Sequence, residues 1–230
     1  MAWRISAAAI SAVVLLIAGV VVWRLVQPER VHTGSAAYDA LHKIVVDIGD
    51  GNVTLSPGTG GVTVEQRLAW TTLRTPALSE SVSGDTLTIR GGCAGTRFDG
   101  HCTASLTITV PDGVAVDVRA DAGELRAQGV TGALKLRAAT GTIRGEGLRA
   151  GDVDVHIDSG DVQLAFAERP RSVTAAAEAG DVTVALAPGA YHVSADTQQG
   201  ERDIQVTEDS AATSTVTART STGDVRIRYS

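Results

Sequence analysis

Ser159-Gly160-Asp161-Val162-Gln163-Leu164 is one copy of a phrase that returns throughout the second half of the chain. The phrase reads small residue, Gly, acid or small polar residue, aliphatic, polar, aliphatic. Its copies lie at Gly123, Gly141, Gly160, Gly180, Gly200 and Gly223, so the steps between them are 18, 19, 20, 20 and 23 residues. A period in this range is typical of repeat architectures, in which each unit packs against its neighbours.

Each repeat is predicted to contain two short strands that meet at the glycine, because only glycine adopts a positive φ at a sharp corner without steric cost. Alternation at period 2 places every second side chain on a buried face. It predicts buried Val162, Val182 and Val225 and solvent-facing Asp161, Asp181 and Asp224. We therefore expect an all-β fold, a β-solenoid resembling a right-handed β-helix. A β-sandwich or barrel of short strands is the alternative.

The end of the repeat region carries two further expectations. The long step from Gly200 to Gly223 predicts a loop or bulge around Arg202-Asp203. The final strand, residues 225–229, is predicted to be an exposed edge of the stack, where Arg226 and Arg228 would disfavour pairing with a second copy.

The bulk composition restricts the class of protein. Aromatic residues make up 3% of the 230 residues, so the core must consist of Val, Leu, Ile and Ala. The formal net charge is -6 and no basic tract is present, which argues against nucleic acid as a partner.

The N-terminal segment differs from the rest of the chain. Residues 5–23 carry no charge and are bracketed by Arg4 and Arg24. As a helix this segment would be roughly 28 Å long, close to the thickness of a bilayer core. No A-x-A-like cleavage site follows directly, so we predict an uncleaved transmembrane signal anchor over residues 5–24, with a cleaved signal peptide as the alternative.

This anchor divides the chain into four parts. Residues 1–4 are expected to form a short cytoplasmic tail, and residues 25–38 a linker. Residues 39–230 are expected to form one extracytoplasmic repeat domain at the cell membrane.

The two cysteines, Cys93 and Cys102, bracket a glycine-rich loop. A single pair in a chain with an apolar N-terminal segment predicts a disulfide in an oxidising compartment, which places the domain outside the cytoplasm. Closing so short a loop would stabilise the fold by roughly 2–3 kcal/mol. A zinc site is the weaker alternative, because only His101 lies nearby.

Three groups of charged residues are candidate sites. Asp154, His156 and Asp158 share one side of a strand near Asp161, and such a group can hold a metal or act as general acid and base. Nothing in the sequence supplies a pocket or a further ligand, so we interpret it as a solvated strand face.

The acids that follow the glycines form the second group. If Asp161, Asp181 and Glu201 stack on successive repeats, a Ca²⁺ ion would relieve their repulsion. Thr142 occupies a position where the stack of acids would continue. The chain also lacks the denser pattern of Gly and Asp that is typical of calcium-binding repeats.

The third group is typical of β-helix enzymes that cleave polysaccharides, which gather Asp and Arg on one face. It consists of four arginines interleaved with three acids, namely Arg119, Arg126, Arg137 and Arg144 with Asp117, Asp121 and Glu124. The same arginines also suit a soluble sheet surface. We assign no catalytic residue, cofactor or metal site.

The order of features resembles the bacterial putative-adhesin family, a domain-of-unknown-function family of β-strand-repeat envelope proteins. The resemblance rests on Gly51-Asn52-Val53-Thr54-Leu55, Leu87-Thr88-Ile89 before Cys93, Val110-Pro111-Asp112-Gly113, Pro188-Gly189-Ala190-Tyr191 and Thr222-Gly223-Asp224-Val225. It implies a β-repeat domain displayed at the cell envelope and supplies no catalytic or binding residues.

These observations together predict a membrane-anchored envelope protein that is not an enzyme. Its partners would be the lipid bilayer, through the N-terminal helix, and cell-wall glycan or envelope proteins, through the repeat surface. The alternatives are an extracytoplasmic carbohydrate-active enzyme and an accessory component of an envelope-stress system.

Overall fold

The computed structural model describes residues 15–16, 18–19, 30–71, 76–93 and 102–230. The fold is all-β. The strands are β1 (Arg30–Tyr38), β2 (Lys43–Gly58), β3 (Val62–Trp70), β4 (Pro76–Ser83), β5 (Thr86–Cys93), β6 (Cys102–Pro111), β7 (Ala115–Gln128), β8 (Leu134–Leu148), β9 (Asp152–Phe166), β10 (Ser172–Ala179), β11 (Val182–Leu186), β12 (Ala190–Gln199), β13 (Arg202–Gln205), β14 (Thr207–Glu208), β15 (Thr215–Thr222) and β16 (Val225–Tyr229).

Long strands connect two sheet faces. The first part of β9 pairs with β10, and its last part, beyond Gly160, pairs with β11. In the same way, residues 43–48 of β2 pair with β5 and residues 51–58 pair with β6. We call the face that contains β5, β10, β15, β12 and the first parts of β2, β7, β8 and β9 the first face. The second face contains β6, β11, β16, β13 and the last parts of the same long strands.

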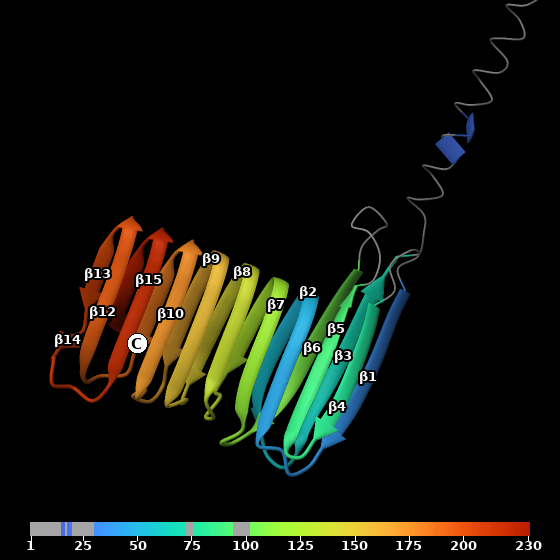
Figure 1. Cartoon of the computed structure of the whole chain (residues 1–230), viewed down its shortest axis with the longest axis horizontal. Helices are drawn as coiled ribbons and strands as arrows, with labels where there is room; N and C mark the ends of the chain where they lie inside the picture. The colour runs from blue at the N-terminus through green and yellow to red at the C-terminus, as the bar shows by residue number, and fades with distance from the viewer. Residues whose placement is uncertain (1–14, 17, 20–29, 72–75, 94–101) are drawn as a thin grey trace, which may run out of the picture.

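The repeats pair in parallel and in register. Leu134, Val153 and Val173 occupy one rung of the first face, on β8, β9 and β10. Figure 1 shows the strands side by side along the long axis, with β12, β13 and β14 at one end and β1 and β4 at the other. Antiparallel pairs close the latter end, where β4 joins β5, and β1 joins β3, which joins β6.

The core lies between the two faces. Val162, Val182 and Val225 are fully buried, as the alternation predicted. On the outward side Asp161 is exposed, whereas the side chains of Asp181 and Asp224 are 44% and 28% exposed. Aliphatic residues dominate this core, and Phe166 and Tyr191 are its largest fully buried side chains.

The repeat glycines lie directly above one another. The φ angle of Gly160 is +132°, in the region that favours glycine. A Cβ on Gly160 would lie 1.8 Å from the carbonyl oxygen of Gly141, so the close approach of neighbouring repeats also requires glycine. The other repeat glycines, Gly123, Gly141, Gly180, Gly200 and Gly223, have φ between +130° and +156°.

The spatial order of the last repeats differs from their order in the sequence. Strand β16 pairs with β11 on one side and with β13 on the other, and β15 lies between β10 and β12. The prediction that residues 225–229 form an exposed edge is therefore wrong. The chain passes first to the end of the stack and then returns, which accounts for the long step between Gly200 and Gly223.

Two segments that were expected to be irregular are strands. Arg202-Asp203 begins β13, and not a loop or bulge. Residues 30–38, which were expected to belong to a linker, form β1 at the edge of the second face.

The predicted transmembrane segment, residues 5–24, lies almost entirely outside the described residues. Within the described part of the chain, no helix has the length and apolar character needed to cross a membrane.

Candidate binding face

The first face carries outward side chains in straight rows, because its strands are parallel and in register. One row runs from Asp117 on β7 through Lys135 on β8 and Asp154 on β9 to Thr174 on β10. Adjacent strands are about 4.8 Å apart, so neighbouring charges in the row alternate in sign at close range. We call this row the alternating row.

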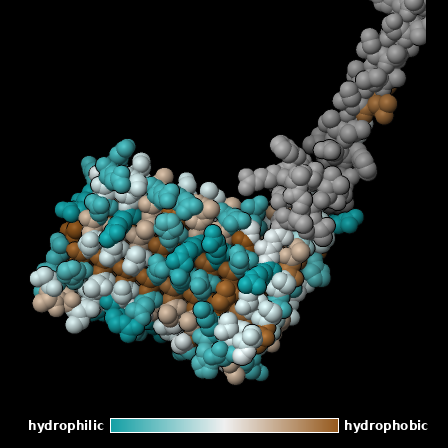
Figure 2. Space-filling model, in the orientation of Figure 1, coloured by the Kyte–Doolittle hydropathy of each residue, from teal (hydrophilic) through white to brown (hydrophobic). Residues whose placement is uncertain are grey.

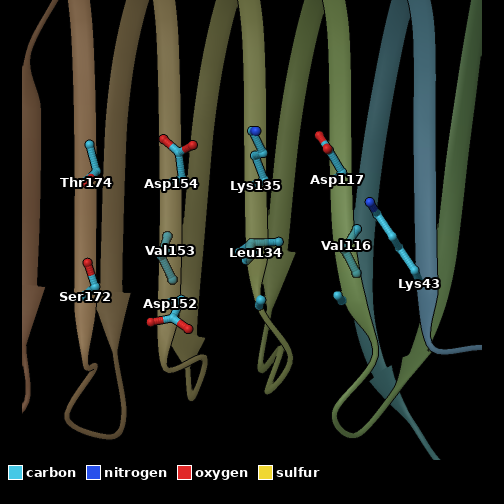
Figure 3. Close-up of a pocket in the computed structure, with 12 residues that line it drawn as sticks. Lys43, Val116, Asp117, Leu134, Lys135, Asp152, Val153, Asp154, Ser172 and Thr174 are labelled. Atoms are coloured by element: carbon cyan, nitrogen blue, oxygen red, sulfur yellow. The ribbon is translucent and has the colours of Figure 1, made fainter.

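A shallow groove of about 560 Å³ lies along this row. Figure 2 shows hydrophilic residues spread over the visible side of the domain, with narrower apolar areas between them. Lys43, Asp152 and Ser172 line the groove together with members of the alternating row. Figure 3 shows these side chains on adjacent strands, with Val116, Leu134 and Val153 between them.

The next row on the first face is richer in cations. Arg119, Arg137 and His156 occupy neighbouring positions on β7, β8 and β9. The Arg137 guanidinium contacts Oδ2 of Asp154 at 3.3 Å, which links this row to the alternating row. Both side chains are more than a third exposed, so such a pair stabilises the fold by at most about 1 kcal/mol. We infer that these charges define a surface more than they hold the fold together.

The turn acids have partners inside the protein. Oδ1 of Asp161 accepts a hydrogen bond from the backbone N–H of Asp181 at 3.0 Å. Asp181 accepts one from Asp224, and Asp224 from Glu201. Asn52 makes the same bond to Glu124, which shows that the role requires an acceptor and not a charge. The acids on successive repeats therefore stack in the order Asp161, Asp181, Asp224 and Glu201, whereas the sequence predicted the order Asp161, Asp181 and Glu201.

Arg226 and a backbone N–H group compensate negative charge among these stacked acids. Arg226 pairs with Asp181 at 3.1 Å and also contacts Asp224. The backbone N–H of Asp224, followed by Arg226, lowers the pKa of Asp181 despite partial burial. For Asp181 and Asp224, these contacts supply the compensation that a Ca²⁺ ion would otherwise provide.

The four arginines considered as an enzyme-like cluster divide between the faces. Arg119 and Arg137 are neighbours on the first face, whereas Arg126 and Arg144 are neighbours on the second. Arg126 contacts Glu124 at 2.9 Å and Glu146 at 3.5 Å, and the hydrogen bond to Glu124 raises its pKa. The arginines do not converge on one groove.

The group around His156 is assembled differently from the expectation. Asp154 turns to Arg137, and Asp161 lies beyond the Gly160 corner. His156 and Asp158 instead meet Glu178 of β10. Glu178 was missed, although it follows Asp158 by 20 residues, one repeat step.

The loop between Cys93 and Cys102 falls largely outside the described residues. Strand β5 ends at Cys93 and β6 begins at Cys102, whose side chain is buried. Residues 94–101 and the side chain of Cys93 are not described, so the disulfide stays a prediction.

Comparison with known proteins identifies the family. The family model described as Toastrack DUF4097 matches residues 36–229. A search among curated proteins found no match.

Several solved structures are similar. A putative cell adhesion protein from Clostridium sporogenes is 8% identical with a TM-score of 0.51, over 87% of this chain and 100% of that one. A putative adhesin from Bacteroides fragilis is 13% identical with a TM-score of 0.45, over 87% and 97% of the two chains. A putative lipid binding protein from Parabacteroides distasonis is 14% identical with a TM-score of 0.31, over 87% and 97%. The Clostridium sporogenes structure, with its TM-score of 0.51, supports the fold assignment. At 8% identity it supports nothing beyond the fold.

Proposed function

The chain belongs to the Toastrack DUF4097 family, and we propose that it is a non-catalytic binding protein of the cell envelope. We further propose that its repeat domain is a β-solenoid that presents the first face to a partner. The parallel pairing on both faces supports the solenoid assignment. The name of the similar Clostridium sporogenes structure, a putative cell adhesion protein, agrees with a binding role.

The observation that carries this proposal is the groove along the alternating row. It is open and shallow, and charges of both signs line it at intervals set by the strand spacing. Sites for small molecules are usually concave and bury most of the ligand. An open groove with both charged and apolar side chains along a sheet instead suits an extended partner with repeating polar groups and apolar faces, such as cell-wall glycan or the surface of an envelope protein.

Membrane attachment through residues 5–24 is part of the proposal. Strand β1 begins at Arg30, so five residues separate it from the predicted anchor. Such a segment spans at most about 20 Å. The end of the stack that carries β1 would therefore stay close to the bilayer, with the domain on the outer side.

Two measurements test the attachment. The full chain is expected to stay in the membrane pellet after alkaline carbonate extraction, whereas a chain without residues 1–24 should be released. Protease added to intact cells should digest the repeat domain. Release of the full chain by carbonate, or protection of the domain from protease, would contradict the anchor or its orientation.

The binding face is tested by cosedimentation with cell-wall fragments from the organism that encodes the chain. We expect Lys135→Ala with Asp117→Ala to weaken binding by about tenfold or more, since both side chains line the groove. The matched control is Arg228→Ala with Asp203→Ala, which removes one exposed charge of each sign from the second face. Equal binding by the two double variants would reject the first face as the site. Release of soluble sugars by the parent protein would favour an enzyme instead.

A further inference from the structure

Three potential metal ligands meet on the first face next to the Gly160 corner. His156 and Asp158 are two residues apart on β9, so both side chains point outward. Their Nε2 and Oδ1 atoms are 3.2 Å apart. Glu178 of β10 lies beside Asp158, because the flanking pairs are Ile157 with Ala177 and Ser159 with Ala179. One ligand atom from each of His156, Asp158 and Glu178 lies within 4.8 Å of the others.

The two carboxylates of this group lack a basic partner of the kind that their neighbours have. Asp152 pairs with Arg171, and Asp154 pairs with Arg137. Among the described residues, Asp158 makes an ion pair with His156 alone, and Glu178 makes none. Like charges on directly adjacent strands destabilise a sheet. The pair therefore favours a cation beside it.

Small residues occupy two of the neighbouring positions, whereas Arg137 of β8, which lies beside His156, is paired with Asp154. Ala176 occupies the position on β10 beside His156. Ala139 of β8 lies beside Asp158, between the pairs Ala138 with Ile157 and Thr140 with Ser159. Neither alanine brings a charge or fills the space beside the two carboxylates, which leaves room there for an ion with bound water.

The ligand types select the class of ion. One imidazole nitrogen and two carboxylate oxygens form a mixed set that suits Zn²⁺ and other first-row divalent ions. Calcium prefers six to eight oxygen ligands, which an imidazole does not supply. The imidazole thus distinguishes this group from an ordinary acidic patch on a sheet.

We propose that His156, Asp158 and Glu178 bind a divalent transition-metal ion such as Zn²⁺. The side chains of His156 and Asp158 are 41% and 54% exposed, so the remaining coordination positions face water. An open position on an exposed face is available to a carboxylate, phosphate or imidazole of a partner. Metal binding itself does not rest on the proposed envelope function.

The full chain, purified and freed of metal, tests the site by titration with Zn²⁺ in a calorimeter and with Co²⁺ in a spectrophotometer. We expect one ion to bind, with a visible Co²⁺ spectrum altered by nitrogen coordination. His156→Ala and Glu178→Gln should each weaken binding by about tenfold or more. Circular dichroism should show that both variants keep the strand content of the parent, since the three side chains point outward.

The matched controls come from the same face. His192→Ala removes another exposed histidine, on β12, and Asp196→Asn removes an exposed carboxylate of β12, away from the proposed ligands. Both controls should bind the ion as the parent does. The site is rejected if the parent binds neither ion, or if His156→Ala and Glu178→Gln bind as tightly as the two controls.

Discussion

Asp181 accepts a hydrogen bond at 2.8 Å from the backbone N–H of Asp224, a residue 43 positions further along the chain. Asp181 directly precedes β11 and Asp224 directly precedes β16, so the bond bypasses the repeat that begins at Gly200. Gly223 accordingly stacks on Gly180, and Gly200 stacks on Gly223. The last strand in the sequence is therefore an inner strand of the sheet, and β13 forms the edge.

Replacing Asp181 separates the role of its acceptor oxygen from that of its charge. Asp181→Asn keeps an oxygen that can accept the Asp224 N–H, as Asn52 does for Glu124. It loses the pair with Arg226, which is exposed and contributes little. We expect Asp181→Asn to change the free energy of unfolding by less than about 0.5 kcal/mol. Asp181→Ala should cost about 1–2 kcal/mol, because the amide loses its partner.

Urea unfolding of the two variants measures this difference. Asp203→Ala serves as the control, since Asp203 lies on the edge strand and contacts Gln205. Equal losses for Asp181→Asn and Asp181→Ala would assign the effect to charge instead of to the acceptor.

The burial pattern within each strand could be predicted from the sequence, because it depends on residues that are adjacent in the sequence. Alternation alone placed Val162, Val182 and Val225 in the core. The strand order could not be predicted, because the phrases at Gly200 and Gly223 are equally able to stack on Gly180. A repeat carries little information about which copy it contacts. The short edge strand β13 suits the end of a sheet, where long free edges invite aggregation.

The sequence grouped two of the three residues of the proposed metal site for the same reason, although it favoured a solvated strand face there. His156 and Asp158 share a strand, and their spacing of two places them on one side. Glu178 comes from the next repeat, so its position depends on the register between β9 and β10. Arg137 removes Asp154 from the group, and that contact also depends on register.

Because Val182 points inward, the same substitution to Asp is expected to destabilise the fold far more at Val182 than at the adjacent Thr183. Val182 is fully buried between Val162 and Val225, whereas Thr183 points outward beside Arg226. Val182→Asp buries a carboxylate without a partner and should cost on the order of 4 kcal/mol or more. Thr183→Asp should be nearly neutral. Soluble yield and thermal unfolding measure both, and similar losses would contradict the assigned register.

The close stacking of the repeat glycines predicts that a Gly→Ala substitution is far more costly at Gly160 than at Gly147. Gly160→Ala would place a methyl group 1.8 Å from the carbonyl oxygen of Gly141, so neighbouring repeats would have to separate. We expect loss of the folded domain. Gly147 also has a positive φ, +58°, but open space around it. Gly147→Ala should therefore cost only about 1–2 kcal/mol, the penalty of that conformation. Comparable stability of the two variants by circular dichroism would argue against close stacking at Gly160.

Tyr38 and Glu80 predict a change in stability at high pH. The Tyr38 hydroxyl donates a hydrogen bond to Glu80, and this bond, aided by burial, raises the pKa of Tyr38 from 10.0 to about 12. Because the folded-state value is the higher one, the stabilisation is complete below about pH 10 and is lost as the pH rises towards about 12. The bond connects β1 with β4, the two strands that close one end of the stack.

Tyr38→Phe should remove this pH dependence. Between about pH 10 and about pH 12, the parent should lose more stability to urea than the variant does. Ultraviolet titration should also lose the tyrosine that ionises at about 12. Parallel stability curves for the two proteins would show that the hydroxyl has no partner in the folded state.

The position of β16 between β11 and β13 is the central claim, because it sets which side chains are neighbours in every row near that end. Paired cysteine substitutions followed by oxidation and mass spectrometry test it most directly. Thr183 and Arg226 occupy adjacent positions on β11 and β16, and Arg226 and Asp203 on β16 and β13. Thr183→Cys with Arg226→Cys should form a disulfide readily, since neighbouring strands lie within the reach of about 4.4–6.8 Å between Cα atoms. Thr183→Cys with Asp203→Cys should stay reduced, because a strand separates the two positions. Rapid crosslinking of residues 183 and 203, without crosslinking of residues 183 and 226, would contradict the arrangement.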